Sequence, residues 1–327
     1  MRKTKAIQAI MKPSILIIGS SNTDMVIKAD HLPAAGETIL GGTFFMNPGG
    51  KGANQAVAAA RLGGRVGFIA KTGNDIFGRQ SLQLFEEEGI NTSNIISDPK
   101  NPSGVALITV DAHAENCIVV ASGANATMNA ADLNMAKEMI LQASIILMQL
   151  EIPVETVEYV VSLTENRNIR VVLNPAPVCS LSDKLLGRIS IFTPNKKEAE
   201  MLTGISITDD ESAKKAALIL AQKGIETVIL TLGPRGALLL HREVFTMVAA
   251  PVVDAVDTTA AGDVFNGSLD VALAEGKEIR DAVYFACCAA AISVTRLGAQ
   301  SSAPYRAEVD SFIQQLSKSN KQKVFPK

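Results

Sequence analysis

The chain has few of the residues on which several large classes of binding sites depend. Its 327 residues include no tryptophan, three tyrosines and three histidines, and aromatic residues amount to 4%. Nucleic-acid sites need stacking aromatics and excess basic charge, whereas the net charge here is −2. We therefore expect no nucleic-acid partner. The three scattered histidines also leave little material for a histidine-based metal site or a Ser-His-Asp triad.

Cysteines and long apolar runs are also scarce. The four cysteines form no C-x-x-C pair, so we expect reduced thiols in a cytoplasmic protein. The longest apolar stretch, residues 282–294, is interrupted and shorter than a bilayer span, which predicts a buried helix and no membrane association. Residues 1–12 are basic and lack the apolar core of a signal peptide. We expect residues 1–13 and 319–327 to be flexible tails.

The chain does contain a repeated alternation of short apolar runs and helical patterns. Apolar runs occupy residues 15–18, 66–70, 145–150, 171–173, 190–192 and 228–231, and helical patterns occupy 52–62, 77–88, 130–142, 154–166 and 212–223. This order predicts an α/β fold with a mostly parallel central sheet flanked by helices. Ligands of such sheets bind beyond the carboxyl ends of the strands. Five polar or glycine positions follow such runs and are expected in one crevice: Asn22, Glu151, Asn174, Asn195 and Gly233.

Two strand pairs interrupt this alternation. Residues 25–28 with 38–45, and 105–110 with 116–121, have strand character without a helix between the members of each pair. They predict a small sheet set apart from the main one; the alternative is two hairpins at the edge of the main sheet. The predicted domain spans residues 14–318, with the small-sheet strands inserted at about 22–47 and 104–122.

Residues 257–263, Asp-Thr-Thr-Ala-Ala-Gly-Asp, precede an apolar helical run. Small residues let a turn approach a ligand closely, and the unpaired N–H groups at a helix start favour an anion. A carboxylate at that position repels phosphate but is well placed to take a proton from a hydroxyl that attacks phosphate. Asp263 is therefore a candidate general base, and the alternative is an ordinary helix N-cap.

A second glycine-rich segment, residues 49–54 (Gly-Gly-Lys-Gly-Ala-Asn), follows a strand-like stretch at 38–46 and opens a helix. It is not a P-loop, because Lys51 is followed by glycine rather than Ser or Thr. It also lacks the dinucleotide fingerprint, which argues against an oxidoreductase. On its own, the segment is equally consistent with a plain turn before a helix.

Together with six further motifs, these two segments resemble the ribokinase-like carbohydrate kinases, and the resemblance extends from residue 15 to about residue 313. The six are residues 19–24 (GSSNTD), 36–38 (GET), 148–151 (MQLE), 173–177 (LNPAP), 193–200 (TPNKKEAE) and 231–233 (TLG). The resemblance implies ATP-dependent phosphorylation of D-ribose at the 5-hydroxyl, giving ribose 5-phosphate. It implies Asp263 as the base, beside an anion hole of backbone N–H groups from Ala260, Ala261 and Gly262.

The resemblance also implies the ligand and cation sites. Sugar-binding residues would be Asn22, Asp24, Gly50, Lys51, Asn54 and Glu151, with Asp263. Nucleotide-binding residues would be Asn195, Thr231, Gly233, Gly236, Gly262 and Cys287. Glu198 would act on Mg²⁺ through water, although Asn195 and Glu198 equally have the spacing of a capping box. A K⁺ site would use Asp257, Thr259, Val294, Leu297 and Ala299.

In the family the small sheet is a lid over the sugar and pairs with a second subunit, so the resemblance implies a homodimer. Two alternative functions stay open at this stage. A related kinase would act on 2-deoxyribose or another small sugar. A protein of a different class would sense sugars without catalysis; intact Asp263 and Gly262 argue against that.

Overall fold

The computed structural model describes residues 15–113 and 115–324. The predicted N-terminal tail, residues 1–13, lies outside them, as do residues 325–327 of the predicted C-terminal tail. The last helix, α11 (Arg306–Val324), continues past residue 318, where the sequence placed the end of the domain. No helix in the described ranges combines the length and hydropathy that crossing a bilayer requires.

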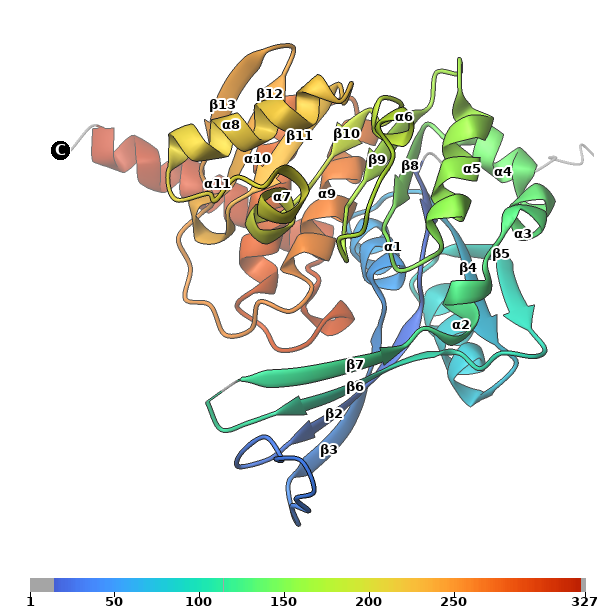
Figure 1. Cartoon of the computed structure of the whole chain (residues 1–327). Helices are drawn as coiled ribbons and strands as arrows, with labels where there is room; N and C mark the ends of the chain where they lie inside the picture. The colour runs from blue at the N-terminus through green and yellow to red at the C-terminus, as the bar shows by residue number, and fades with distance from the viewer. Residues whose placement is uncertain (1–14, 114, 325–327) are drawn as a thin grey trace, which may run out of the picture.

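A nine-stranded sheet forms the centre of the larger part of the molecule (Figure 1). It is parallel except for the β11–β12–β13 end, where two antiparallel pairings complete it. In spatial order its strands are β13 (Val244–Val248), β12 (Ala237–His241), β11 (Thr227–Thr231), β10 (Ile191–Phe192), β9 (Arg170–Leu173), β8 (Ile145–Met148), β1 (Ile15–Ile18), β4 (Val66–Gly73) and β5 (Asn91–Asp98). β1 and β8 are buried on both faces, which explains their uninterrupted apolar sequence.

Helices cover both faces of this sheet and enclose two apolar cores. One core includes residues of α1 (Lys51–Arg61), α2 (Ile76–Glu87), α9 (Ala261–Ala274), α10 (Ile279–Ser293) and α11. The other includes residues of α3 (Ala130–Met135), α4 (Lys137–Gln142), α5 (Val154–Thr164), α6 (Asp183–Leu186), α7 (Lys196–Thr203) and α8 (Asp210–Gln222). The predicted α/β architecture is therefore confirmed.

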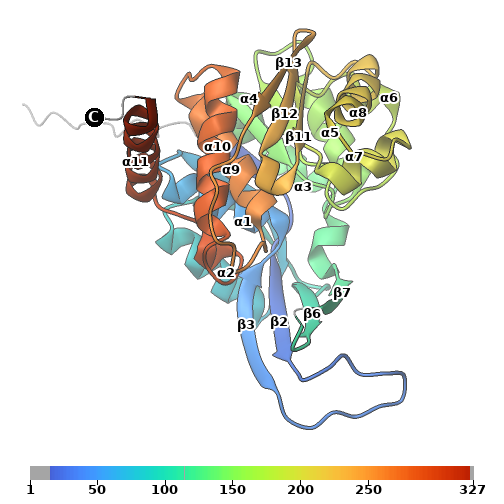
Figure 2. The same cartoon turned by 90° about the vertical axis from the view of Figure 1, so that its left-hand side faces the viewer.

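The small sheet projects from the edge of this body (Figures 1 and 2). Its order is β3 (Thr43–Gly49), β2 (Asn22–Lys28), β6 (Gly104–Val110) and β7 (Asn116–Ala121). Paired residues across these strands share a face. One face, here called the inner face, carries Asn22, Asp24 and Val120; the opposite, outer face carries Met46, Leu107 and Val119 among other apolar side chains.

Several element boundaries differ from the sequence-based prediction. The strand predicted from Thr38 begins at Thr43, because Gly41 and Gly42 adopt left-handed φ angles of 106° and 94° that no extended strand contains. The helix predicted over 130–142 is two helices that meet at Ala136. Strands β5, β12 and β13 were not predicted. The first helix starts at Lys51, directly after the glycine pair.

Candidate active site

Two adjoining cavities lie where the small sheet meets the carboxyl ends of the main strands. The first, of about 320 Å³, is lined by Asn22, Ser122, Asn125 and Glu151, among others. The second, of about 160 Å³, is lined among others by Lys51, Asn174, Asn195, Glu198, Thr231 and the turn at 260–263. The backbone N–H of Lys51, which lines the second cavity, donates at 3.0 Å to Oε2 of Glu151, which lines the first. Of the five residues expected in one crevice, only Gly233 lines neither cavity.

Asp263 lies in the first turn of α9, in the wall of the second cavity. The residue is 5% exposed, and its oxygens accept hydrogen bonds from Asn54 Nδ2 and Gln55 Nε2, both at 2.9 Å. Burial raises the pKa of Asp263, while the charge of Lys51 and the two amide donors act in the opposite direction. A buried, oriented carboxylate with a raised pKa has the properties of a general base.

The turn before Asp263 offers backbone donors to the same cavity. Ala260 takes a left-handed conformation with φ of 58°, which only a few per cent of non-glycine residues adopt. The N–H of Ala261 donates to the Thr258 carbonyl at 3.2 Å and closes the turn. Within the described ranges, the N–H groups of Gly262 and Asp263 bond to no protein acceptor. These free donors at a helix start favour a bound anion.

Acidic side chains surround Lys51 where the cavities join. Burial, followed by the charges of Glu151 and Asp263, raises the pKa of Asp24 to about 6. Asp263 and then Glu151 and Glu198 raise the pKa of Lys51 against its burial. Ser20 Oγ donates to Glu151 Oε2 at 2.5 Å and orients that carboxylate. Several hydrogen-bond acceptors are therefore concentrated around the Lys51 ammonium group. A ligand with several hydroxyl groups needs such acceptors for its O–H donors.

Two glycines are required by the geometry of this region. Gly50 has φ of 87°, and a Cβ there would lie 2.7 Å from the backbone nitrogen of Asn22. A Cβ on Gly49 would lie 2.3 Å from Asp24 Oδ2. Residues 49 and 50 therefore lie directly against the strand that carries Asn22 and Asp24.

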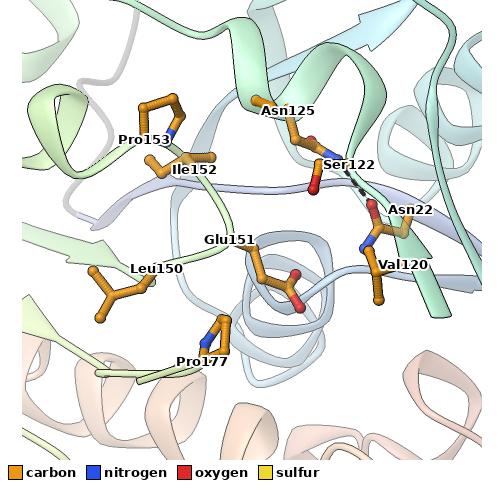
Figure 3. A pocket seen from close by; sticks show the side chains of 10 residues that line it. Asn22, Val120, Ser122, Asn125, Leu150, Glu151, Ile152, Pro153 and Pro177 are labelled. Atoms are coloured by element: carbon orange, nitrogen blue, oxygen red, sulfur yellow. Dashed lines mark hydrogen bonds between the residues drawn. The ribbon is translucent and has the colours of Figure 1, made fainter. Parts of the chain in front are cut away.

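Asn22 is fixed by a neighbour that the sequence did not indicate. Asn125, in the 3₁₀ turn η1 (Gly123–Thr127), donates from Nδ2 to Asn22 Oδ1 at 2.8 Å (Figure 3). Glu151 points into the same cavity in that view. Both carboxamides are buried at the base of the inner face of the small sheet.

Comparison with known proteins identifies the family to which this arrangement belongs. Residues 12–306 match the family described as pfkB family carbohydrate kinase. The chain belongs to the pfkB family of carbohydrate kinases. It is 44% identical over 304 residues to a ribokinase from Haemophilus influenzae, covering 93% of this chain and 99% of that protein. The ribokinase-type kinase activity expected from the sequence is therefore confirmed.

Two further relatives bear on the substrate. A deoxyribokinase from Salmonella typhi is 37% identical over 304 residues, covering 93% of this chain and 98% of the relative. The solved structure of an Arabidopsis thaliana ribokinase complexed with ribose and ATP superimposes with a TM-score of 0.86 at 30% identity. It covers 92% of this chain and 99% of that one.

Of the residues predicted to bind nucleotide in this pfkB-family kinase, Asn195 and Thr231 lie on neighbouring segments joined by a β-bridge and line the second cavity. Gly233 is exposed nearby, while Gly236 has φ of 97° and would place a Cβ 2.0 Å from the Val248 carbonyl. Gly236 therefore shapes the loop through its backbone. Cys287, in α10, is 4% exposed in the core and lines neither cavity.

Glu198, the residue that the sequence associated with Mg²⁺, hydrogen-bonds with Asn195. Asn195 and Glu198 form a reciprocal capping box, so the structural alternative is confirmed; Glu198 still lines the second cavity and fits a water-mediated role toward Mg²⁺. The described residues contain no cluster of three or more acidic, His or Cys side chains that would hold a metal directly.

Asp257 contacts two of the other residues predicted to hold K⁺, Thr259 and Val294, and also contacts Gly298, which lies between the remaining two, Leu297 and Ala299. Asp257 Oδ1 accepts from the Thr259 N–H and Oδ2 from the Gly298 N–H, both at 2.9 Å, and its own N–H donates to the Val294 carbonyl at 3.1 Å. Burial raises the pKa of Asp257, but these hydrogen bonds outweigh it and lower the pKa overall. Asp257 therefore joins the turn before α9 to the segment after α10.

Sequence reasoning missed the amides that orient the predicted residues. Gln55 donates to Asp263 and to Asn174 Oδ1, and accepts from Gln149 Nε2. Asn266 accepts from Thr193 Oγ1 at 2.6 Å and donates to the Gly262 carbonyl at 2.7 Å. Gln55 stands directly after Asn54 in the glycine-rich motif, which is the one signal that pointed toward it. Nothing in the sequence around Asn125 marked it.

Proposed function

We propose that this kinase transfers the γ-phosphoryl group of ATP to the 5-hydroxyl of D-ribose, with Asp263 as the general base. The observation that carries this proposal is the position of Asp263. It is a buried carboxylate between two amide donors, in the first turn of a helix whose first residues, Ala261 and Gly262, line the second cavity. In that position one residue reaches both the acceptor hydroxyl and the transferred group.

In this proposal the cavity at the small sheet holds the sugar ring. Asn22, Asp24, Asn54 and Glu151, with the backbone at Gly50 and Lys51, bind the ring hydroxyls, so that the exocyclic 5-hydroxyl extends toward Asp263. Asp263 takes its proton as the oxygen attacks phosphorus. The N–H groups of Ala260 and Gly262 bind the charged phosphoryl oxygens, whereas the N–H of Ala261 donates to the Thr258 carbonyl and is not available for this role. Positioning and charge neutralisation supply most of the catalysis of phosphoryl transfer.

The nucleotide would lie along the second cavity, beside Asn195, Thr231, Gly233 and Gly236; Cys287, which lies in the core, would not contact it. Mg²⁺ on the phosphates would neutralise their charge, and Glu198 would orient its water ligands. A K⁺ ion held by Asp257 and the carbonyls of Thr259, Val294, Leu297 and Ala299 would stiffen the turn at 260–262. The hydrogen bond between Asp257 and Gly298 supports this, because it already ties the two segments together.

We further propose a homodimer that pairs through the small sheet. The support is an exposed apolar outer face: Ile27 is 45%, Phe44 57%, Leu107 56% and Val119 63% exposed. Contiguous exposed apolar side chains mark interaction surfaces. The four cysteines are free thiols, which suits the cytoplasm. Small-molecule substrates, rather than nucleic acid or membrane, are its expected partners.

The second candidate is a kinase of 2-deoxyribose, favoured by the 37% identity to the Salmonella deoxyribokinase. Purified protein with ATP and Mg²⁺ should be assayed on a panel of pentoses and hexoses, in K⁺ and in Na⁺. A site that bonds a hydroxyl rejects the analogue lacking it, so we expect ribose to be preferred in kcat/KM by about tenfold or more. Equal efficiency for the two pentoses would contradict the ribose proposal. Turnover of no sugar would favour a non-catalytic sensor.

A further inference from the structure

The orientation of the Asn22 carboxamide depends on Asn125. The two side chains are 5% and 1% exposed, respectively, and Asn125 Nδ2 lies 2.8 Å from Asn22 Oδ1. A carboxamide presents an acceptor on one side and a donor on the other, so a bond to Oδ1 turns Nδ2 the other way. In Figure 3 the amide nitrogen of Asn22 lies on the side of its carboxamide away from Asn125.

The orientation of Asn125 is itself set by the backbone. The N–H of Ser21 can only donate, and it does so to Asn125 Oδ1 at 3.0 Å. The Ser21 carbonyl can only accept, and it does so from Asn125 Nδ2 at 3.1 Å. These two bonds leave a single orientation for the Asn125 amide, with Nδ2 toward Asn22. Asn22 therefore has one orientation as well.

Hydrogen bonds to neighbouring segments hold the turn that carries Asn125 in place. Lys71 Nζ donates to the Thr127 carbonyl at 3.2 Å and to Asp132 Oδ2 at 2.9 Å. Thr127 Oγ1 donates to Asp98 Oδ2 at 2.9 Å, and the N–H of Ala124 donates to the Pro102 carbonyl at 2.8 Å. These contacts fix η1 against β4 and the segment after β5, so Asn125 cannot follow a reoriented Asn22.

We propose that Asn125 is a positioning residue for the sugar: it holds Asn22 so that the NH₂ group of Asn22 donates to a ring hydroxyl. In the described ranges no protein acceptor binds Asn22 Nδ2, and Asn22 lines the sugar cavity. The nearby carboxylates of Asp24 and Glu151 only accept when ionised. A donor from Asn22 therefore complements them, because a hydroxyl that donates its single proton to one carboxylate can still accept from the NH₂ group of Asn22. This inference rests on the proposed sugar site.

Asn125→Asp tests the inference, because a carboxylate still accepts from the Ser21 N–H but offers Asn22 no donor. Asn22 then turns its NH₂ toward the introduced carboxylate and presents oxygen to the sugar. We expect KM for D-ribose to rise about tenfold or more, with KM for ATP and kcat nearly unchanged. The matched control is Asn166→Asp, the same change at an exposed residue after α5 whose φ of 59° Asp also tolerates.

A double-mutant cycle separates positioning from a general structural effect. If Asn125 acts through Asn22, Asn125→Asp should change KM less than about twofold in an Asn22→Ala background. An unchanged KM in the single variant, or an equally large effect in both backgrounds, would overturn the inference. If Asn125→Asp does not fold, Gly104→Ala attacks the same contact, since its Cβ would lie 2.1 Å from Asn22 Oδ1 and 2.3 Å from Asn125 Nδ2.

Failure of the proposed function can be distinguished from failure of this inference. If the unmodified protein phosphorylates a different sugar, the same variants are measured with that sugar. If it phosphorylates none, D-ribose binding is measured by calorimetry for the unmodified protein and the Asn125→Asp variant. Tighter binding or equal binding by the variant would overturn the positioning role, and weakened binding would support it.

Discussion

The main sheet and the small sheet bury their strands in opposite ways. β1 and β8 are covered on both faces, and the site lies at their carboxyl ends. In contrast, every residue of β7 is exposed. The inner face of the small sheet carries Asn22 and Asp24 of the proposed sugar site, and its outer face carries exposed apolar side chains without a covering helix among the described residues. The main body therefore supplies a preformed catalytic end, while the small sheet depends on a ligand on one face and, in our proposal, a partner on the other.

The largest expected effect lies in the main body. Asp263→Asn removes the proposed base but retains the size of the side chain, so kcat should fall about 10²–10⁴-fold while ATP and sugar binding stay nearly unchanged. Asp209→Asn, at an exposed N-cap, is the control. Steady-state kinetics and calorimetry measure the two quantities. A variant with half the original kcat would exclude Asp263 as the base.

The outer face of the small sheet can be tested separately. Val119→Asp places a charge beside Leu107, on the face that also carries Met46 and Phe44, so a dimer formed through this face should dissociate to monomers at micromolar concentration. We also expect a higher KM for sugar, because the unsupported sheet would hold Asn22 and Asp24 less firmly. Met201→Asp, on the exposed side of α7, is the control. Sedimentation showing the same mass for both variants would contradict the proposed interface.

A smaller effect should reveal how the catalytic end is tuned. Gln55→Leu removes a donor that lowers the pKa of Asp263 against burial. The pKa should therefore rise, and the acid limb of the pH profile of kcat should move up by about one unit. Activity at alkaline pH should change little. Gln83→Leu, on the exposed face of α2, is the control. An acid limb that does not move would show that Gln55 has no effect on the pKa of Asp263.

The smallest effect concerns stability at the sugar end. The pKa of Asp24 in the folded protein is about 6 against an ordinary 3.8, so ionised Asp24 destabilises the fold above about pH 6. Asp24→Asn should raise Tm by about 2–4 °C at pH 7.5, and the gain should vanish near pH 4. The same variant should bind sugar poorly. Scanning calorimetry of Asp24→Asn beside exposed Asp30→Asn checks this, and a lower Tm would refute it.

The sequence predicted those parts of the molecule that follow from local patterns. Alternating apolar runs and helices led to the α/β body, and glycine-rich turns before helices pointed to both ends of the site. Strand β5 was missed because its residues, 91–98, are mostly polar and half-buried at the sheet edge. Residues 130–142 appeared as one helix because Ala136, where the chain breaks, has high helix propensity.

The orienting amides could not be predicted for a different reason. Gln55 meets Asp263 across 208 residues, and Asn125 meets Asn22 across 103. When the fold brings an amide and its partner together over such long sequence separations, no short sequence motif marks the pair. Asn195 and Glu198 show the reverse case, since three-residue spacing predicted their capping box but left the metal role undecided.

The packing of α1 against α9 sets a limit on how this enzyme can change over evolution. Both helices begin at the site, and they run side by side because Gly267 has no side chain: a Cβ there would lie 2.6 Å from the Gln55 carbonyl. Gly267 touches neither cavity. It nevertheless sets the separation between the glycine-rich sugar turn and the carboxylate that would deprotonate the sugar. Selection for activity therefore acts on an interior position with no chemistry of its own, and catalogues of ligand-contacting residues would overlook it.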